Sequence, residues 1–271
     1  MAFSTIEESR QLGAPQFLYD FSLNEKHWRH VTGTATINAD GFAWTPLPIS
    51  DSGNKQKGDP TSETLIVVIP SSHDIVKFFA STPPSSPVYL TVRSLHVGDT
   101  ESVVRYVGEI TNVNQPRPGA AELSCTTISA SLNRDGLRLG WSRTCPHSVY
   151  DGGCKAVKAN YKVDGTIDTV APGIITVSEV AVLPDDWFSG GFIEWVDPDR
   201  GLERRAIEKH TGNQLLLFGT SDGLTGGLEL SMYPGCDRTT LTCRDKFNNL
   251  PNYGGVPSMP DKSPFDGNPV Y

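Results

Sequence analysis

The stretch Cys145-Pro-His-Ser-Val-Tyr-Asp-Gly-Gly-Cys154 places eight residues between two cysteines, and Cys236-Asp-Arg-Thr-Thr-Leu-Thr-Cys243 places six between two more. The 81 residues between the pairs, from Lys155 to Gly235, consist of short apolar runs and turn signals. Four thiolates from these pairs can meet only if the intervening segment folds and brings its ends together. A shared site would therefore close the second half of the chain into one unit.

The segment between the cysteine pairs has the pattern of a β domain. Short runs rich in apolar residues alternate with Gly, Asn, Asp and Pro, which are typical of turns. We expect Trp187 and Trp195 in the core of this domain. Seven closely spaced strands favour a small barrel or sandwich. The pattern predicts these strands at 161–164, 166–170, 174–177, 192–197, 202–208, 214–218 and 228–232.

The first half of the chain also reads as strands and turns. A meander of three antiparallel strands is predicted at 88–97, 102–113 and 121–130, and a short helix with a serine N-cap at 71–79. The last of these strands places Leu123 and Cys125 on one face because side chains alternate along a strand. We therefore expect Cys125 to be a buried core thiol and not a ligand.

The length of the chain, 271 residues, favours two domains, which we place at 1–136 and 137–271. With 26 Gly and 20 Pro, short strands and turns are favoured over a helical bundle. We expect a mainly β protein with two β-rich, barrel- or sandwich-like domains. Residues 244–271 carry five prolines and predict an extended tail rich in Pro and Gly.

Composition and motifs limit the possible functions. The net charge of −8 argues against a nucleic-acid-binding surface, which needs clustered Lys and Arg. The N-terminus has no secretory signal pattern, and the longest aliphatic run, 65–69, is too short to insert in a membrane. A reducing cytoplasm is expected, where spaced cysteines are more often metal ligands than disulfides. No P-loop, dinucleotide, zinc-protease or serine-hydrolase motif supports an enzyme.

Four thiolates at one point suit soft or borderline metals, so the two pairs indicate zinc or an iron–sulfur cluster. Structural zinc commonly uses spacers of about two to four residues, whereas spacers of eight and six fit a larger object. Spacing alone leaves both open, with disulfides as a third alternative. His147 could replace one ligand, but four cysteines suffice and we expect an ordinary loop histidine. His27 and His30 could share a helical face, but no carboxylate supports a metal site and we expect surface residues.

The residues around both pairs carry a resemblance to a known family. Cys243-Arg-Asp-Lys-Phe-Asn-Asn249 runs into Asn252-Tyr-Gly-Gly-Val-Pro257, and Trp141-Ser-Arg-Thr-Cys145 leads into the first pair. With the two spacers, these motifs resemble phage conserved hypothetical proteins of the tail tip or baseplate hub of long-tailed bacteriophages. The four-cysteine domain resembles lambda tail tip protein L in its cysteine spacing. The resemblance is specific over about 137–260, and Tyr253 stands where the family more often carries Phe.

The resemblance implies a structural hub of the tail tip or baseplate, located in the virion and assembled in the host cytoplasm. Carried over residue by residue, Cys145, Cys154, Cys236 and Cys243 would ligate a 4Fe–4S cluster, with zinc as the alternative. The resemblance also implies a homo-oligomeric ring, a trimer, between the distal tail protein and the central tail fibre or tip attachment protein. The alternative to this structural role is a tail-associated enzyme, either a redox protein or a cell-wall hydrolase.

Overall fold

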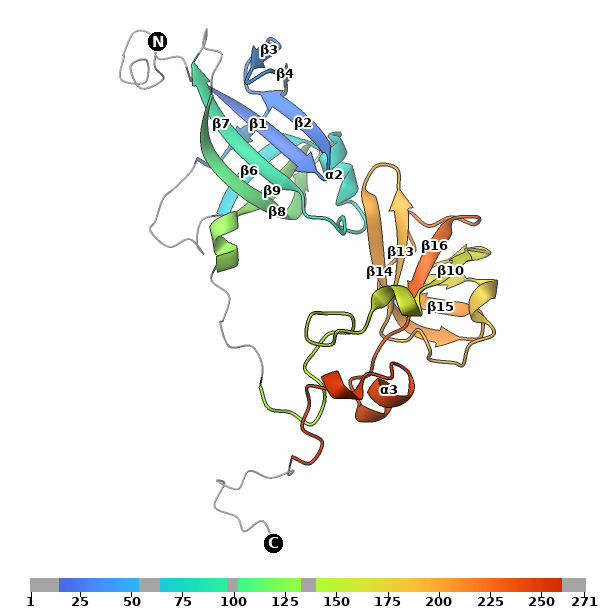
Figure 1. Cartoon of the computed structure of the whole chain (residues 1–271). Coiled ribbons are helices and arrows are strands. Elements are labelled where there is room, and N and C mark those ends of the chain that lie inside the picture. The colour runs from blue at the N-terminus through green and yellow to red at the C-terminus, as the bar shows by residue number, and fades with distance from the viewer. Residues whose placement is uncertain (1–14, 54–63, 97–101, 133–139, 260–271) are drawn as a thin grey trace. The chain divides into compact units, whose positions relative to one another are not determined.

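The computed structural model describes residues 15–53, 64–96, 102–132 and 140–259, and this part of the chain is mainly β (Figure 1). It divides into two compact units. The first comprises the described residues up to 132 together with 197–203, and the second comprises 140–196 and 204–259. The mainly β class predicted from the sequence is confirmed. The boundary expected at 136 lies outside the described residues.

The first unit is built on one nine-stranded sheet with the order β3-β4-β2-β1-β7-β8-β9-β6-β5. Neighbouring strands pair antiparallel, except that β2 and β4 are parallel. The predicted meander corresponds to β7, β8 and β9. The strands are β1 (Pro15–Leu23), β2 (Lys26–Val31), β3 (Ile37–Ala39), β4 (Phe42–Pro46), β5 (Ser50–Asp51), β6 (Thr64–Pro70), β7 (Tyr89–His96), β8 (Val103–Arg117) and β9 (Ala120–Thr127).

The core of the first unit follows the alternation of its strands. On β6 and β9, Leu65 pairs with Cys125 and Val67 pairs with Leu123, and all four side chains are buried. Cys125 is fully buried, and burial raises the pKa of its thiol to about 12. The predicted core thiol is therefore confirmed. Beyond β9 the chain continues into a short 3₁₀ helix, η1 (Ile128–Leu132).

The predicted helix of the first half is present but shorter than expected. It is α2 (Asp74–Phe78), and Ile75 and Val76 bury its inner face in the core of the first unit. The N-cap is His73 and not a serine, because the imidazole Nδ1 accepts the Ile75 N–H at 3.2 Å. The helical face that His27 and His30 could have shared does not form, since both lie on strand β2. Of the two expected surface residues, His27 is exposed and His30 is half-buried.

The second unit is built on a seven-stranded sheet with the order β10-β16-β13-β14-β15-β12-β11. All seven strands expected from the sequence are present, with ends shifted by up to three residues. The first begins later than predicted because Tyr161 ends the 3₁₀ helix η2 (Lys158–Tyr161). The strands are β10 (Val163–Thr166), β11 (Thr169–Ala171), β12 (Ile174–Thr176), β13 (Phe192–Asp197), β14 (Gly201–Thr211), β15 (Gln214–Leu217) and β16 (Glu229–Tyr233).

The core of the second unit contains Trp195, which is 4% exposed, and Phe188, which is fully buried. Trp187 is partly buried against this core. The 3₁₀ helix η3 (Ser178–Val180) follows β12 and buries Val180. The expected placement of both tryptophans on the core is therefore confirmed, and neither is left as an isolated exposed ring.

The chain after β16 differs from the extended tail predicted from residue 244 on. Here α3 (Thr240–Asp245) reaches beyond Cys243, and the 3₁₀ helix η4 (Leu250–Asn252) follows. Pro251 lies in the first turn of η4, where a missing N–H removes no helical hydrogen bond. Residues 253–259 have no regular secondary structure, and 260–271 lie outside the described residues. Within the described part of the chain, no helix is long and apolar enough to cross a membrane.

Candidate metal centre

The four predicted ligands come from a loop, a linker and a short helix of the second unit. Cys145 and Cys154 flank the loop, Cys236 follows the end of β16, and Cys243 lies in α3. All four are free thiols, of which Cys243 is buried and the other three are half-buried. In Figure 1 the yellow-green segment that carries the loop lies beside the red α3.

Asp151 organises the loop between Cys145 and Cys154. Its Oδ1 accepts the N–H groups of Gly153 at 2.9 Å and Cys154 at 2.6 Å, and its Oδ2 accepts the Ser148 N–H at 2.9 Å. These bonds, led by the one from Cys154, lower the pKa of Asp151. The carboxylate therefore stays ionised at neutral pH and fixes the backbone at Cys154.

His147 fills the space between this loop and the segment that follows α3. A Cβ atom added at Gly153 would overlap the imidazole at Nδ1, and one added at Gly254 would overlap it at Nε2. At both positions a Cβ would force the His147 imidazole to shift, and neither glycine has a left-handed backbone. The loop histidine expected from the sequence is a half-buried packing residue.

A second carboxylate organises the turn that leads from Cys236 into α3. Asp237 Oδ1 accepts the Thr239 N–H at 2.9 Å and the Thr239 hydroxyl at 2.8 Å. Thr239 is the N-cap of α3, where its Oγ1 accepts the Thr242 N–H at 3.2 Å. The Cys243 N–H donates to the Thr239 carbonyl at 3.1 Å, which holds Cys243 on the first turn of the helix.

Hydrogen bonds join the two cysteine pairs. The Cys145 N–H donates to the Arg238 carbonyl at 3.0 Å, so the first pair is attached to the turn between Cys236 and Cys243. The Tyr253 hydroxyl lies at 2.7 Å from the Arg143 carbonyl and 3.2 Å from that of Arg238. The segment before the first pair, the turn inside the second pair and the segment after α3 therefore meet at one place.

Three of the four thiols accept an N–H···S hydrogen bond. Donors at sulfur stabilise thiolates and tune the reduction potential of iron–sulfur clusters. The thiol of Cys243, in α3, has no such bond among those found in the described residues. The bonds run from the Arg238 N–H to Cys236 Sγ (3.4 Å), from the Gly254 N–H to Cys145 Sγ (3.4 Å) and from Asn249 Nδ2 to Cys154 Sγ (3.6 Å).

The thiols influence one another electrostatically. Burial raises the pKa of Cys243, and the charges of Cys236, Cys145 and Cys154 raise it further. Burial is also the largest cause of the raised pKa of Cys236, to which Cys154 and Cys145 contribute. Burial and this mutual repulsion both favour the protonated thiols of Cys236 and Cys243 when no cation is bound.

Within the described ranges, no group of three or more His, Cys, Asp or Glu side chains is arranged to hold a single metal ion. The segments that carry the four thiols are joined by hydrogen bonds, and the thiols affect one another's pKa, but they do not form the close group that one tetrahedral ion brings together. A cubane presents iron corners that are separated by several ångströms, and each corner takes one cysteine. The donor set, four thiols with amide donors at three sulfurs, fits such a cluster. Its binding stays a prediction.

An aromatic cluster attaches the loop of the first pair to the sheet. The centroid of the Tyr150 ring lies 6.0 to 6.4 Å from those of four other aromatic rings. The Tyr150 hydroxyl donates to the Pro234 carbonyl at 2.9 Å. Burial is the main cause of the raised pKa of Tyr150. The loop is thereby fixed to β13, β16 and η2. The four rings are those of Tyr161, Phe192, Tyr233 and Phe247.

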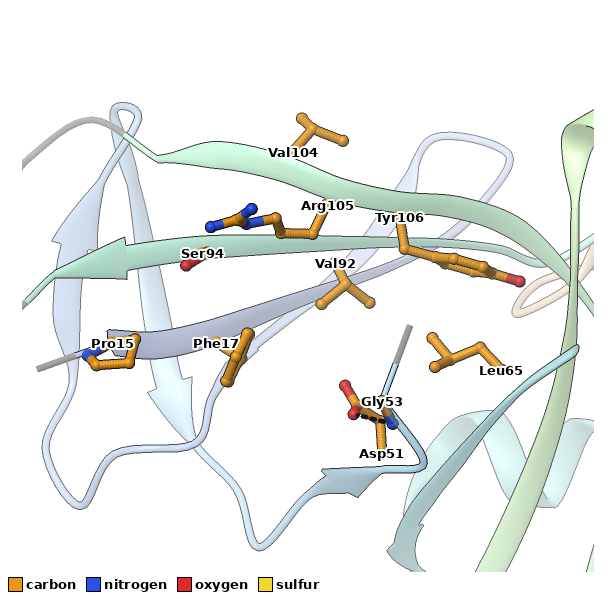
Figure 2. A pocket seen from close by; sticks show the side chains of 10 residues that line it. All are labelled: Pro15, Phe17, Asp51, Gly53, Leu65, Val92, Ser94, Val104, Arg105 and Tyr106. Carbon is orange, nitrogen blue, oxygen red and sulfur yellow. Dashed lines mark hydrogen bonds between the residues drawn. The ribbon is translucent and has the colours of Figure 1, made fainter. Parts of the chain in front are cut away.

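A separate cavity of about 620 Å³ lies in the first unit, as Figure 2 shows. Phe17, Val92 and Tyr106 line it together with Asp51, whose carboxylate accepts the Tyr19 hydroxyl at 2.6 Å and the Gly53 N–H at 2.9 Å. The Asp51 carboxylate is thus already bonded within the fold. Chain segments on either side of the lining strands lie outside the described residues. This cavity is a weaker candidate than the cysteine site.

Sequence reasoning identified the four thiols but missed the residues that hold them. Asn249, Gly153 and Gly254 contact Cys154 or His147 through pairings that depend on the folded chain. Asn249 and Gly254 do lie in the motif that carried the family resemblance. That motif was therefore the sequence signal that could have identified Asn249 and Gly254 as site residues.

Comparisons with known proteins agree with this motif. Residues 186–263 match the family described as "Phage conserved hypothetical protein BR0599", and the match includes the second cysteine pair but not the first. No curated protein matches the chain. A chain in the structure "Virion of native gene transfer agent (GTA) particle" has a similar fold, with a TM-score of 0.77 and 16% identity over 100% of this chain and 99% of that chain.

Proposed function

We propose that this protein is a structural virion component, a hub of a phage-type tail tip or baseplate. Cys145, Cys154, Cys236 and Cys243 bind a 4Fe–4S cluster in its second unit. The cluster supplies four iron–thiolate bonds that cross-link distant parts of the chain. Its role is to stabilise the fold and not to catalyse a reaction.

The observation that carries the proposal is the convergence of the two cysteine pairs. The Cys145 N–H is bonded to the turn inside the second pair, and three of the four sulfurs already accept amide donors. A loop and a turn without regular structure gain little stability from their backbone alone. Metal–thiolate bonds at this place would therefore contribute directly to folding.

The virion role is supported by two findings. The second cysteine pair lies inside the match to the phage family, and a chain of a gene transfer agent virion has the same fold over its whole length. A hub assembles as a ring, here a trimer, between the distal tail protein and the central tail fibre or tip attachment protein. The net charge of −8 suits a channel through which DNA passes without binding.

Metal analysis of anaerobically purified protein tests the site. We expect about four iron and four sulfide per chain by cluster stoichiometry, a brown colour, and loss of both in Cys145→Ser and Cys236→Ser. Cys125→Ala is the matched control, because this thiol is buried in the first unit and its variant should keep full metal. If the protein is colourless and contains one zinc per chain, the four cysteines bind zinc and not a cluster. Full metal in both serine variants would contradict the four-cysteine site.

Assembly is tested separately from metal binding. Purified chain mixed with the distal tail protein of the same particle should form a ring-shaped complex, observable by electron microscopy and mass photometry. A monomer that stays unbound at micromolar concentration contradicts the hub role. It leaves the metal result unaffected.

A further inference from the structure

Asn249 lies where the segment after α3 meets the loop of the first cysteine pair. Asn249 is 9% exposed, and its Nδ2 donates to the Cys154 carbonyl at 2.5 Å. The same Nδ2 lies 3.6 Å from Cys154 Sγ, within the range of an N–H···S bond. Its backbone N–H donates to the Cys243 carbonyl at 2.9 Å. One residue thus contacts a ligand from each pair.

The orientation of this amide is fixed by a neighbour. Asn252 Nδ2 donates to Asn249 Oδ1 at 2.7 Å, so the oxygen of Asn249 faces Asn252 and its NH₂ group faces Cys154. The Asn252 N–H also donates to the Asn249 carbonyl at 3.0 Å, which keeps the two side chains together. A flipped amide would place two oxygens against each other at Cys154 and is therefore excluded.

Asn249 differs from the other donors at the ligand sulfurs. Among the described residues, the bonds to Cys145 and Cys236 come from backbone N–H groups, whereas the bond to Cys154 comes from a side chain. A backbone donor is present whatever residue occupies the position. The donor to Cys154 depends on the identity of Asn249.

We infer that Asn249 is a positioning residue that holds Cys154 in the ligand set of the metal centre, with Asn252 setting its orientation. The inference rests on the proposed four-cysteine site. Two donors on one amide fix both the backbone and the sulfur of Cys154. Neighbours that orient a ligand in this way typically change metal affinity by about 10–100-fold when they are removed.

Asn249→Leu tests the inference, because leucine has nearly the same size and no donor. We expect iron to leave the anaerobically prepared chain about 10–100-fold faster in the presence of a ferrous chelator. Asn252→Leu should act in the same direction with a smaller effect, since Asn249 keeps its donor but loses its orientation. Asn114→Leu, at an exposed position of β8, is the matched control and should release iron at the original rate.

The order in which cysteines are labelled distinguishes positioning from general destabilisation. With iodoacetamide present during iron release, mass spectrometry should find Cys154 alkylated ahead of the other three ligands in Asn249→Leu. Simultaneous labelling of all four, or iron release unchanged from the original chain, would overturn the inference. If Asn249→Leu does not fold, as shown by circular dichroism, Asn252→Leu carries the same comparison.

Metal content and cysteine labelling together distinguish a failure of this inference from a failure of the proposed function. If the original chain binds neither iron nor zinc, the metal site is wrong, and labelling of the metal-free chain still reports on Asn249. Loss of the tether should then raise the alkylation rate of Cys154 relative to Cys236 in the same molecule. An unchanged ratio overturns the role of Asn249 whatever the metal content.

Discussion

The Nε2 atoms of His30 and His73 lie 2.8 Å apart, and the bonds around them fix which ring nitrogens carry protons. His73 Nδ1 accepts the Ile75 N–H, so the proton of His73 is on Nε2 and is donated to His30. His30 then carries its own proton on Nδ1 and donates it to Thr45 Oγ1 at 3.0 Å. The Thr45 hydroxyl donates to the Arg29 carbonyl at 3.1 Å. Both neutral imidazoles thus link α2 to β2 and β4.

We expect the first unit to lose stability as the pH falls from about 6.5 to about 4. The pKa of His73 is lowered to about 4, mainly by burial and next by the charge of His30. An unfolded histidine has a pKa of about 6.5, so the unfolded state binds more protons across this window. The stabilising contribution is complete above pH 6.5 and declines below it. Because the ring is only half-buried, we expect a loss on the order of 1 kcal/mol, measured by urea unfolding at stepped pH.

His73→Asn is the control for this pH dependence. Asparagine is a good N-cap, so α2 keeps an acceptor for the Ile75 N–H, while the titrating group is removed. The nearby Asp74–Lys77 ion pair, at 2.8 Å, is unchanged. The variant should lose less stability between pH 6.5 and 4 than the original chain. An identical loss in both would assign the effect to other groups.

The two glycines around His147 should be intolerant of alanine. Gly153→Ala and Gly254→Ala each place a methyl group where the imidazole lies, and overpacking of this kind costs about 1–3 kcal/mol. Gly152→Ala is the matched control, because a Cβ there meets nothing within 4 Å. Thermal unfolding of the three variants, prepared with metal, should separate the first two from the third.

A double-mutant cycle identifies His147 as the cause. In Gly254→Ala, the additional change His147→Ala removes the overlapping ring and should restore part of the lost stability. The coupling free energy should be nonzero and favourable for the double variant. Strictly additive effects would mean that Gly254 is needed for a different reason, such as the approach of the added Cβ to Pro146.

Local patterns predicted the β architecture well because burial in this chain follows strand alternation. The run 192–197 coincides with β13, and Leu65, Val67 and Cys125 face the core as alternation requires. The helical face that His27 and His30 could have shared does not form. Their spacing of three residues fits a helix, but β2 pairs with β1 from Leu18↔Val31 to Leu23↔Lys26, and this pairing overrides the spacing.

The candidate site was predictable only in part. Cysteine spacing is local information and identified the four thiols, whereas the contacts of Asn249 and His147 join segments that are about a hundred residues apart. The helix α3 was missed because Thr240 and Thr242 have low helix propensity. Its stability comes from the Thr239 N-cap and Asp237, and an Asp-x-Thr pattern before the helix was a usable sign of its start.

Glu194 should be essential for the stability of the second unit. Glu194 is 7% exposed, and its Oε1 accepts from Lys158 Nζ and Arg204 Nε, each at 2.5 Å. Glu194→Gln keeps the shape but removes the negative charge that Lys158 Nζ and Arg204 Nε contact, and we expect a loss of about 1–3 kcal/mol in urea unfolding. Asp164→Asn removes a solvent-exposed pair with Lys162 and should have no measurable effect.

The ion pairs of Glu194 with Lys158 and Arg204 should also make the second unit less stable in acid. Burial by itself raises the pKa of Glu194, but the bonds from Lys158 and Arg204 outweigh it and the pKa is lowered on balance. The stabilising contribution is therefore present above the unfolded glutamate pKa of about 4.3 and is lost as the pH falls through the lower folded value. Glu194→Gln should remove this loss. Equal acid sensitivity of both proteins would contradict the assignment.

Tyr150 should determine how firmly the first cysteine loop is held to the sheet. Its φ of 67° is unfavourable for an aromatic residue, so the contacts of its side chain must offset that strain. Tyr150→Phe keeps the ring and loses only the bond to the Pro234 carbonyl, for an expected cost of about 0.5–1.5 kcal/mol. Tyr150→Ala also loses four ring contacts, and we expect about 3–5 kcal/mol.

Hydrogen exchange of the metal-free chain locates this effect. If the ring fixes the loop, Tyr150→Ala should accelerate exchange of the peptide that contains Cys154, while peptides from β14 and β15 exchange at their original rates. Tyr89→Ala removes a tyrosine that is 41% exposed on β7 of the first unit, and it should leave the loop unchanged. Faster exchange throughout the second unit would instead mean that Tyr150 supports the whole sheet. The loop would then depend on the core and the four cysteines, and not on this one ring, for its position.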